Sequence, residues 1–162
     1  MPDANDIPDH HEQFMREAIR EALLAAEAGE VPVGAVVVAE GVIVARAHNA
    51  VESQRMGTAH AELLAIQEAS RRLGMWRLDG CTLYVTKEPC AMCAGAMVNC
   101  RVPELVFGCA DAKTGAAGGA LSVTAMPEGF HTVHTIGGVL QQECLEILQQ
   151  FFRKRRQESK LG

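Results

Sequence analysis

The chain has 162 residues, of which 48% are hydrophobic and 22% charged, a composition typical of one globular domain with a buried core. Its polar, acidic start contains no signal-peptide core, and no apolar run approaches the roughly 18–20 residues that a membrane helix needs, which predicts a cytoplasmic protein without a membrane partner. The formal net charge of −5 argues against a general nucleic-acid coat, although residues 151–162 carry +4 and the rest of the chain −9.

The hydrophobic patterns predict a single domain over residues 1–162, with a loose acidic lead-in over 1–8. Helices are predicted over 10–28, 60–73, 90–99 and 141–160, and strands over 33–39, 42–47, 81–86, 104–109 and, weakly, 133–139. Glu40-Gly41 is predicted to form a tight hairpin turn, and 48–59 and 110–119 are predicted loops. A hairpin followed by right-handed βαβ crossovers gives an α/β fold, a mixed sheet with helices on both faces.

The first candidate chemical motif is Cys90-Ala-Met-Cys93, which follows a predicted strand and a proline. A spacing of three residues on a helix points both sulfurs to one side, and the N–H groups of a helix start stabilise thiolates. Alone, the motif is compatible with a redox pair, half of a structural zinc site, or two core cysteines. Six cysteines also permit a disulfide framework, but that interpretation requires a secreted context, so we expect reduced thiols.

A second motif, His60-Ala61-Glu62, also begins a predicted helix. If the two helix starts meet, His60, Cys90 and Cys93 supply three ligands and leave the fourth tetrahedral position of zinc to water, as in catalytic zinc sites. Glu62 would lie beside the metal without binding it and would move protons between water and substrate. Together the motifs match the H-x-E…P-C-x-x-C signature of zinc deaminases, which predicts one Zn²⁺ per subunit and hydrolytic deamination.

The last predicted helix ends in a basic tail, with positive charges at Arg153, Lys154, Arg155, Arg156 and Lys160. A terminal basic cluster on an acidic body indicates a local contact with a polyanion. The alternative is a solvated helix end, because Lys and Arg also favour the last turns of helices. Charge alone does not decide between these two interpretations.

Beyond the metal motif, the sequence resembles the bacterial tRNA adenosine deaminase (TadA) family of the cytidine/deoxycytidylate deaminase superfamily, from about Glu12 to Lys160. The metal motif is shared by zinc nucleobase and nucleoside deaminases in general, whereas the loop and tail segments are closer to this family. The segments that carry the resemblance are Glu30-Val-Pro-Val-Gly-Ala35, Thr58-Ala-His-Ala-Glu62, Thr82-Leu-Tyr-Val-Thr86, Glu88-Pro-Cys-Ala-Met-Cys-Ala-Gly-Ala-Met97, Val106-Phe-Gly108, Asp111-Ala-Lys-Thr-Gly-Ala-Ala-Gly118, Phe151-Phe-Arg153 and Arg155-Arg-Gln157.

The resemblance implies a three-layer α/β/α cytidine-deaminase-like fold around a five-stranded sheet. It also implies a homodimer whose two subunits both contact a tRNA anticodon stem-loop. The implied reaction is the conversion of adenosine to inosine at the wobble position, with an arginine tRNA as the expected substrate. The target base would have to be flipped out or already unstacked to reach the zinc.

The resemblance implies substrate-binding roles for several residues. Asn49 would hydrogen-bond the adenine, the backbone around Ala61 and Pro89 would line the pocket, and Asp111 would contact the target ribose. Without the resemblance, Asn49 is better explained as a turn residue and Asp111 as a loop cap. The resemblance also implies RNA contacts by Lys113, Phe152, Arg153, Arg155 and Arg156, although the phenylalanines also suit core or subunit packing.

Three departures from the family pattern concern the substrate and not the metal. Met56-Gly57-Thr58 stands where many relatives have Asp-Pro-Thr, which predicts a more flexible loop at the pocket mouth. Lys87 replaces a leucine and places a new charge near the pocket rim. Phe130-His131-Thr132 lacks the family's asparagine, so RNA contacts by this loop are not predicted. The remaining thiols, of Cys81, Cys100, Cys109 and Cys144, are predicted buried small hydrophobes, and no role is predicted for His10, His11, His48 and His134.

Two other functions remain open at this point. A deaminase of free bases or nucleosides, such as cytosine or guanine, would share the metal site but would need neither the basic tail nor the loop from Asp111 to Gly118. A zinc-stabilised RNA-binding module would bind the same metal and RNA without turnover.

Overall fold

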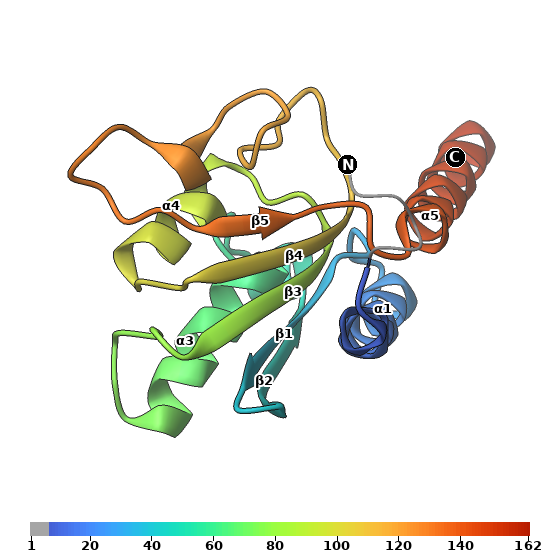
Figure 1. Ribbon diagram of the computed structural model, residues 1–162. Coiled ribbons are helices and arrows are strands. Elements are labelled where there is room, and N and C mark those ends of the chain that lie inside the picture. Colours follow the sequence, from blue (N-terminus) through green and yellow to red (C-terminus); the bar gives the residue numbers. More distant parts are fainter. Residues whose placement is uncertain (1–6) are drawn as a thin grey trace.

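A computed structural model describes residues 7–162, so the predicted lead-in over 1–8 lies largely outside the described residues. Five strands form one sheet in the order β2-β1-β3-β4-β5 (Figure 1). The strands are β1 (Gly34–Ala39), β2 (Val42–His48), β3 (Cys81–Lys87), β4 (Glu104–Cys109) and β5 (His134–Ile136). The helices are α1 (Asp9–Glu27), α2 (Val51–Gln54), α3 (Ala61–Leu73), α4 (Ala91–Asn99) and α5 (Gln141–Leu161), with a 3₁₀ turn, η1, over Val123–Ala125.

The sheet is mixed, as predicted. β1 pairs antiparallel with β2 and β3, whereas β4 runs parallel to β3 and β5. The β1–β2 hairpin turns at Glu40 and Gly41, with φ of 51° and 74°. Two successive residues with positive φ are typical of the turns whose twist matches that of the flanking strands. The predicted tight turn is therefore confirmed.

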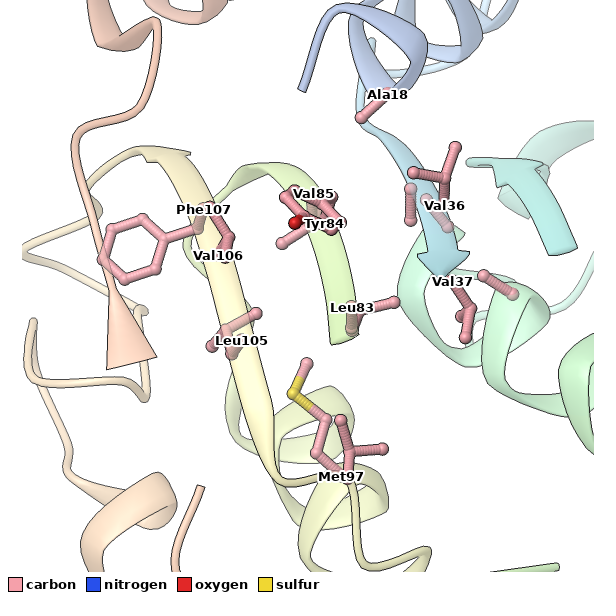
Figure 2. Packing of buried hydrophobic residues seen from close by; sticks show 14 of the residues in the cluster. Ala18, Val36, Val37, Leu83, Tyr84, Val85, Met97, Leu105, Val106 and Phe107 are labelled. Atoms are coloured by element: carbon pink, nitrogen blue, oxygen red, sulfur yellow. The ribbon is translucent and has the colours of Figure 1, made fainter. Parts of the chain in front are cut away.

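Helices cover both faces of the sheet, which confirms the three-layer arrangement: α1 and α5 lie on one face, and α3 and α4 on the other (Figure 1). Side chains of neighbouring strands line up in register and alternate between these faces. Val36, Tyr84 and Val106 are in register on the α1 side, and Leu83 pairs with Leu105 on the opposite side (Figure 2). All five are buried, so the core has two halves separated by the sheet.

The C-terminal helix α5 extends over 21 residues, close to its predicted bounds. Cys144 and Leu148 are buried, and the helix packs against β4. Beyond Phe151 its side chains are exposed, so the basic tail lies on the surface. No helix within residues 7–162 combines the length and the apolar character needed to cross a membrane.

Two helical turns were absent from the sequence prediction. The region 48–59, predicted as a loop, contains α2, and η1 lies between the predicted loop over 110–119 and the weak strand over 133–139, where no element was predicted. α2 forms because the buried Glu30 carboxylate accepts the backbone N–H groups of Glu52 (2.6 Å) and Ser53 (3.3 Å), which a helix start leaves without partners. This tertiary contact spans more than twenty residues, so the local sequence pattern contains no sign of it.

The start of β1 and the ends of β2, β3 and β4 meet at one edge of the sheet. Gly34 pairs with His48, and Lys87 with Cys109. Gly34 must be glycine because a Cβ atom there would collide with the backbone of α1. The segments that follow these strands therefore gather at one place, which is where the site is found.

Candidate active site

A cavity of about 270 Å³ opens at this edge of the sheet. Its walls combine segments that are distant in the sequence: Asn49 after β2, His60 and Glu62 at the start of α3, Cys90 at the start of α4, and Arg155 from α5. The convergence of strand ends and helix starts explains how both chemical motifs reach one cavity.

The three predicted metal ligands lie together, and His60 and Cys90 line this cavity. His60 and Cys90 are the N-cap residues of α3 and α4. The helices therefore begin one residue later than predicted. Cys93 lies in the first turn of α4, and the Nδ1 atom of His60 is 3.6 Å from the sulfurs of both Cys90 and Cys93. All three ligand atoms lie within 4.8 Å of one another.

The donor set fits zinc. With Zn–S and Zn–N distances of about 2.3 and 2.0–2.1 Å, tetrahedral zinc places nitrogen and sulfur ligands roughly 3.6 Å apart, which agrees with the distances from His60 to both thiols. A hydrogen bond between the side chains of Cys90 and Cys93 lowers the pKa of Cys90 to about 4, and backbone N–H groups at the helix start also lower it. The pKa of Cys93 is raised by the same shared proton and by burial. The lowered pKa of Cys90 favours its thiolate, the form in which cysteine binds a metal.

Glu62 lies beside these ligands and lines the cavity, but it is not one of the three grouped ligands. Its side chain is buried with 4% exposure. Burial is the largest influence on the Glu62 carboxyl and raises its pKa, while its own backbone N–H and the nearby His60 oppose the shift. A buried carboxyl beside a metal site is well placed to hold and release a proton.

Asn49 and Ala61 are joined by a hydrogen bond. The Ala61 N–H donates to Oδ1 of Asn49 at 2.8 Å, which ties the end of β2 to the start of α3. Asn49 lines the cavity, whereas Ala61 is fully buried between two cavity residues, His60 and Glu62. The contact uses the carbonyl oxygen of the Asn49 side chain and leaves its amide group as a donor at the cavity.

Asp111 holds the loop that follows β4. Its Oδ1 atom accepts the N–H groups of Lys113 (2.9 Å) and Thr114 (3.0 Å), and its Oδ2 atom accepts the Thr114 hydroxyl (2.6 Å). Lys87 forms an ion pair with the same Oδ2 at 2.9 Å. Burial raises the pKa of Asp111, but the bonds from Thr114, Lys87 and the loop N–H groups outweigh it and hold the pKa well below its usual range. Asp111 therefore does cap the loop, and it is ionised.

A second, larger hollow of about 790 Å³ lies next to the cavity, and Lys87 lines both. Its wall includes residues that the resemblance connects with RNA: Asp111, Lys113, Phe152, Arg153 and Arg156. Phe152 is 42% exposed and contacts Phe151 edge to face. The tail thus brings two arginines to the same surface as the loop lysine, beside the cavity.

Arg155 differs from its neighbours in the tail. It lines the metal-site cavity and not the second hollow. Its guanidinium donates to the Gly29 carbonyl at 2.6 Å and lies 4.9 Å from the ring centre of Phe151. These contacts fix α5 to the loop between α1 and β1 at the cavity wall.

Glu88 is a structural anchor that the sequence reading did not single out. The side chain is 4% exposed and accepts three backbone N–H groups of the loop after β4, from Asp111 (3.1 Å), Ala117 (3.0 Å) and Gly119 (2.9 Å). Pro89 lies between two cavity residues, Glu88 and Cys90. Its carbonyl accepts the Ala116 N–H at 2.8 Å. The only signal in the sequence is an acidic residue before Pro89, and it does not reveal that residue's distant partners.

Three histidines outside the metal site, and the four cysteines outside it, belong to the scaffold. His11 bonds to the Tyr84 hydroxyl (2.8 Å), His48 to Glu21 (2.9 Å), and His131 to the carbonyl of Val102 (2.7 Å). All six cysteines are free, as predicted. Cys81, Cys109 and Cys144 are buried as predicted, whereas Cys100 is half-buried, and burial raises the pKa of all four thiols.

Known proteins share this fold and these motifs. Residues 9–156 match the family model of the MafB19-like deaminases. The tRNA-specific adenosine deaminase of Bacillus subtilis (strain 168) is 50% identical over 149 residues, which cover 92% of each chain. A structure from biochemical and structural studies of A-to-I editing by tRNA:A34 deaminases at the wobble position of transfer RNA is 40% identical, with a TM-score of 0.81 over 84% of this chain and 99% of that one. A guanine deaminase from Bacillus subtilis is 38% identical, with a TM-score of 0.61 over 67% of this chain and 70% of its own.

Proposed function

The chain belongs to the family of tRNA-specific adenosine deaminases, and from this premise we propose that it hydrolyses adenosine to inosine at the wobble position of a tRNA. The observation that carries the proposal is the convergence of His60, Cys90 and Cys93 beside the buried carboxyl of Glu62. The adjoining hollow lined by Lys113 and the tail arginines supports a polyanionic substrate over a free base.

His60, Cys90 and Cys93 would hold zinc, which would act as a Lewis acid and make water a nucleophile near neutral pH. Glu62 takes a proton from the attacking water and gives it to the adenine ring nitrogen beside the attacked carbon. It then moves a second proton to the departing amino group, so that adenosine and water yield inosine and ammonia. Because Glu62 is shielded from bulk solvent, its proton stays with the reacting groups between these transfers.

The cavity holds the base through groups that the fold already orients. Asn49 donates its side-chain amide to the adenine, and its bond to the Ala61 N–H fixes that orientation. The segments around Ala61 and Pro89 border the base. Asp111, which lines the second hollow and pairs with Lys87, meets the ribose of the target nucleotide, and a 2′-hydroxyl there distinguishes RNA from DNA.

The RNA backbone lies along the second hollow, where Lys113, Phe152, Arg153 and Arg156 make the contacts. Arg155, fixed to Gly29, forms the wall of the cavity. We further infer a single deaminase domain over residues 1–162 that acts as a homodimer in the cytoplasm, with an arginine tRNA as its substrate. Family membership supports these four inferences.

Incubation of the zinc-loaded protein with an RNA anticodon stem-loop, and separately with free adenosine, cytosine and guanine, tests the substrate. We expect inosine in the stem-loop and no turnover of the free compounds. Turnover of guanine or cytosine without turnover of the stem-loop would refute the tRNA assignment in favour of a free-base deaminase. Inosine at one wobble position in total cellular tRNA, lost when the protein is absent, would identify the tRNA.

A Glu62→Gln variant separates catalysis from binding. We expect turnover to fall by at least about 10³-fold, while zinc content and stem-loop affinity remain at wild-type values. The matched control is Glu68→Gln, on the same helix but bonded to Arg71 and Arg72 on the surface. Turnover retained in Glu62→Gln would refute its proton-transfer role, and a wild-type protein that binds zinc and RNA without turnover would identify a binding module.

A further inference from the structure

Lys87 stands in the wall between the cavity and the second hollow, and it lines both. It is the last residue of β3, in register with Cys109 at the end of β4, so its backbone is held by the sheet. Its side chain is 34% exposed, whereas that of its partner Asp111 is 14% exposed. The end of β3 therefore carries a cation that solvent, and anything bound in the two hollows, can reach.

The ion pair with Lys87 is one of four contacts to the Asp111 carboxylate. Two loop N–H groups occupy Oδ1, and the Thr114 hydroxyl and Lys87 occupy Oδ2. A carboxylate offers about four acceptor positions, so Asp111 accepts nothing further until one donor leaves. Three of the donors belong to the loop that Asp111 caps. Lys87 is the one partner that can leave without unfolding the loop.

The charge around the second hollow determines where Lys87 can go. Lys113, Arg153 and Arg156 line the same hollow and form no ion pair within residues 7–162. A nucleotide whose base enters the cavity and whose backbone follows the hollow must place a phosphate at the shared wall. An ion pair between partly exposed side chains contributes little net stability, so a phosphate can replace Asp111 as the partner of Lys87.

We propose that Lys87 is a phosphate-binding residue of the substrate site, which pairs with Asp111 in the free protein and transfers to a backbone phosphate next to the target nucleotide when RNA binds. The proposal deepens the proposed function and rests on it. The transfer also frees one acceptor position on Asp111 for the substrate, so that binding of phosphate and of sugar are coupled at one residue.

The test measures how the affinity of the zinc-loaded protein for a product stem-loop, with inosine at the target position, changes with salt. Each phosphate contact contributes roughly 0.7–0.9 to the slope of log affinity against log salt. We expect Lys87→Met to reduce the slope by about that amount and to weaken binding several-fold at about 0.1 M salt, and Lys87→Arg to keep the wild-type slope. Arg72→Met, which removes one charge at the far end of α3, is the matched control.

Single methylphosphonate substitutions then locate the contact. One position beside the target nucleotide should weaken wild-type binding and have no further effect in Lys87→Met, because both changes remove the same ion pair. If Lys87 only holds the loop through Asp111, Lys87→Met will weaken binding with an unchanged slope, and the proposal is overturned. Failure of the wild-type protein to bind the stem-loop would overturn the tRNA substrate and this proposal together. Binding by the wild type, with the same salt slope in Lys87→Met, would overturn the role of Lys87 alone.

Discussion

Replacement of Glu88 by glutamine changes one buried oxygen to an NH₂ group and leaves the shape almost unchanged. The carboxylate accepts one loop N–H at Oε1 and two at Oε2. The amide of glutamine retains the pair of bonds if its oxygen faces Ala117 and Gly119. Its NH₂ group then faces the N–H of Asp111. Both groups are donors, so this hydrogen bond is lost. The variant should therefore loosen the loop after β4 and not the metal ligands.

The magnitude follows from these three contacts. A hydrogen bond to a charged group contributes about 1.5–3 kcal/mol and a neutral one about 0.5–1.5 kcal/mol, and an unsatisfied buried donor costs about 1–3 kcal/mol. One lost bond and two weakened ones, partly offset by the lower cost of burying an amide, predict a decrease of about 2–4 kcal/mol in the free energy of unfolding. At a urea m value of about 2 kcal/mol/M, the midpoint falls by about 1–2 M.

Urea unfolding at fixed zinc concentration measures the effect, with the exposed Glu128→Gln as the isosteric control, which we expect to stay within about 0.5 kcal/mol of wild type. Zinc content should be unchanged, while kcat/KM for the stem-loop falls by about tenfold or more because Asp111 loses its fixed position. A midpoint within 0.2 M of wild type would refute the conclusion that Glu88 anchors the loop, and a loss of zinc would show that it supports the metal site instead.

Three further variants test other contacts. Asn49→Ala should cost about 1 kcal/mol in urea unfolding and most of the turnover, because it removes both the bond to the start of α3 and the donor to the base; equal turnover would contradict its role. Gly115→Ala places a Cβ against the Glu88 carboxylate and should lower the thermal midpoint by several degrees, whereas Gly57→Ala, in open space, should not. Burial, with a smaller contribution from the neighbouring His10, lowers the pKa of His11, so the folded state loses stability as pH falls below about 6.5. The difference in free energy of unfolding between wild type and His11→Gln should therefore shrink from about pH 7 to about pH 5. A constant difference would refute this explanation.

The elements and the metal ligands could be predicted because their signals are local. Runs of β-branched residues predict the first two strands, and glycine at 74, where φ is 67°, ends α3 as expected. His60 and Cys90 each precede a helix, and strand order brings the two helix starts together. The spacing of Cys90 and Cys93 on one helix then completes the ligand set.

Neither α2 nor the geometry of the loop after β4 could be predicted, because both depend on buried long-range contacts. Glu30 and Glu88 read as ordinary acids in the sequence, yet each accepts backbone N–H groups from a segment more than twenty residues away. Asp111 can be recognised by resemblance, but its ion pair with Lys87 is visible only in the structure. Nothing in a one-dimensional pattern shows which acceptor positions are filled.

The four residues from Lys87 to Cys90 each have a different task in this molecule: an ion pair with Asp111, the anchor of a loop, a carbonyl that accepts the N–H of Ala116, and a metal ligand. This segment should therefore tolerate changes of length very poorly during evolution, because one inserted or deleted residue would displace all four contacts at once. Residues 157–161 of α5 are exposed and line neither the cavity nor the second hollow, so they are free of that constraint. New substrates are thus expected to arise by lengthening or recharging the tail, while the strand-to-helix junction keeps its length across lineages.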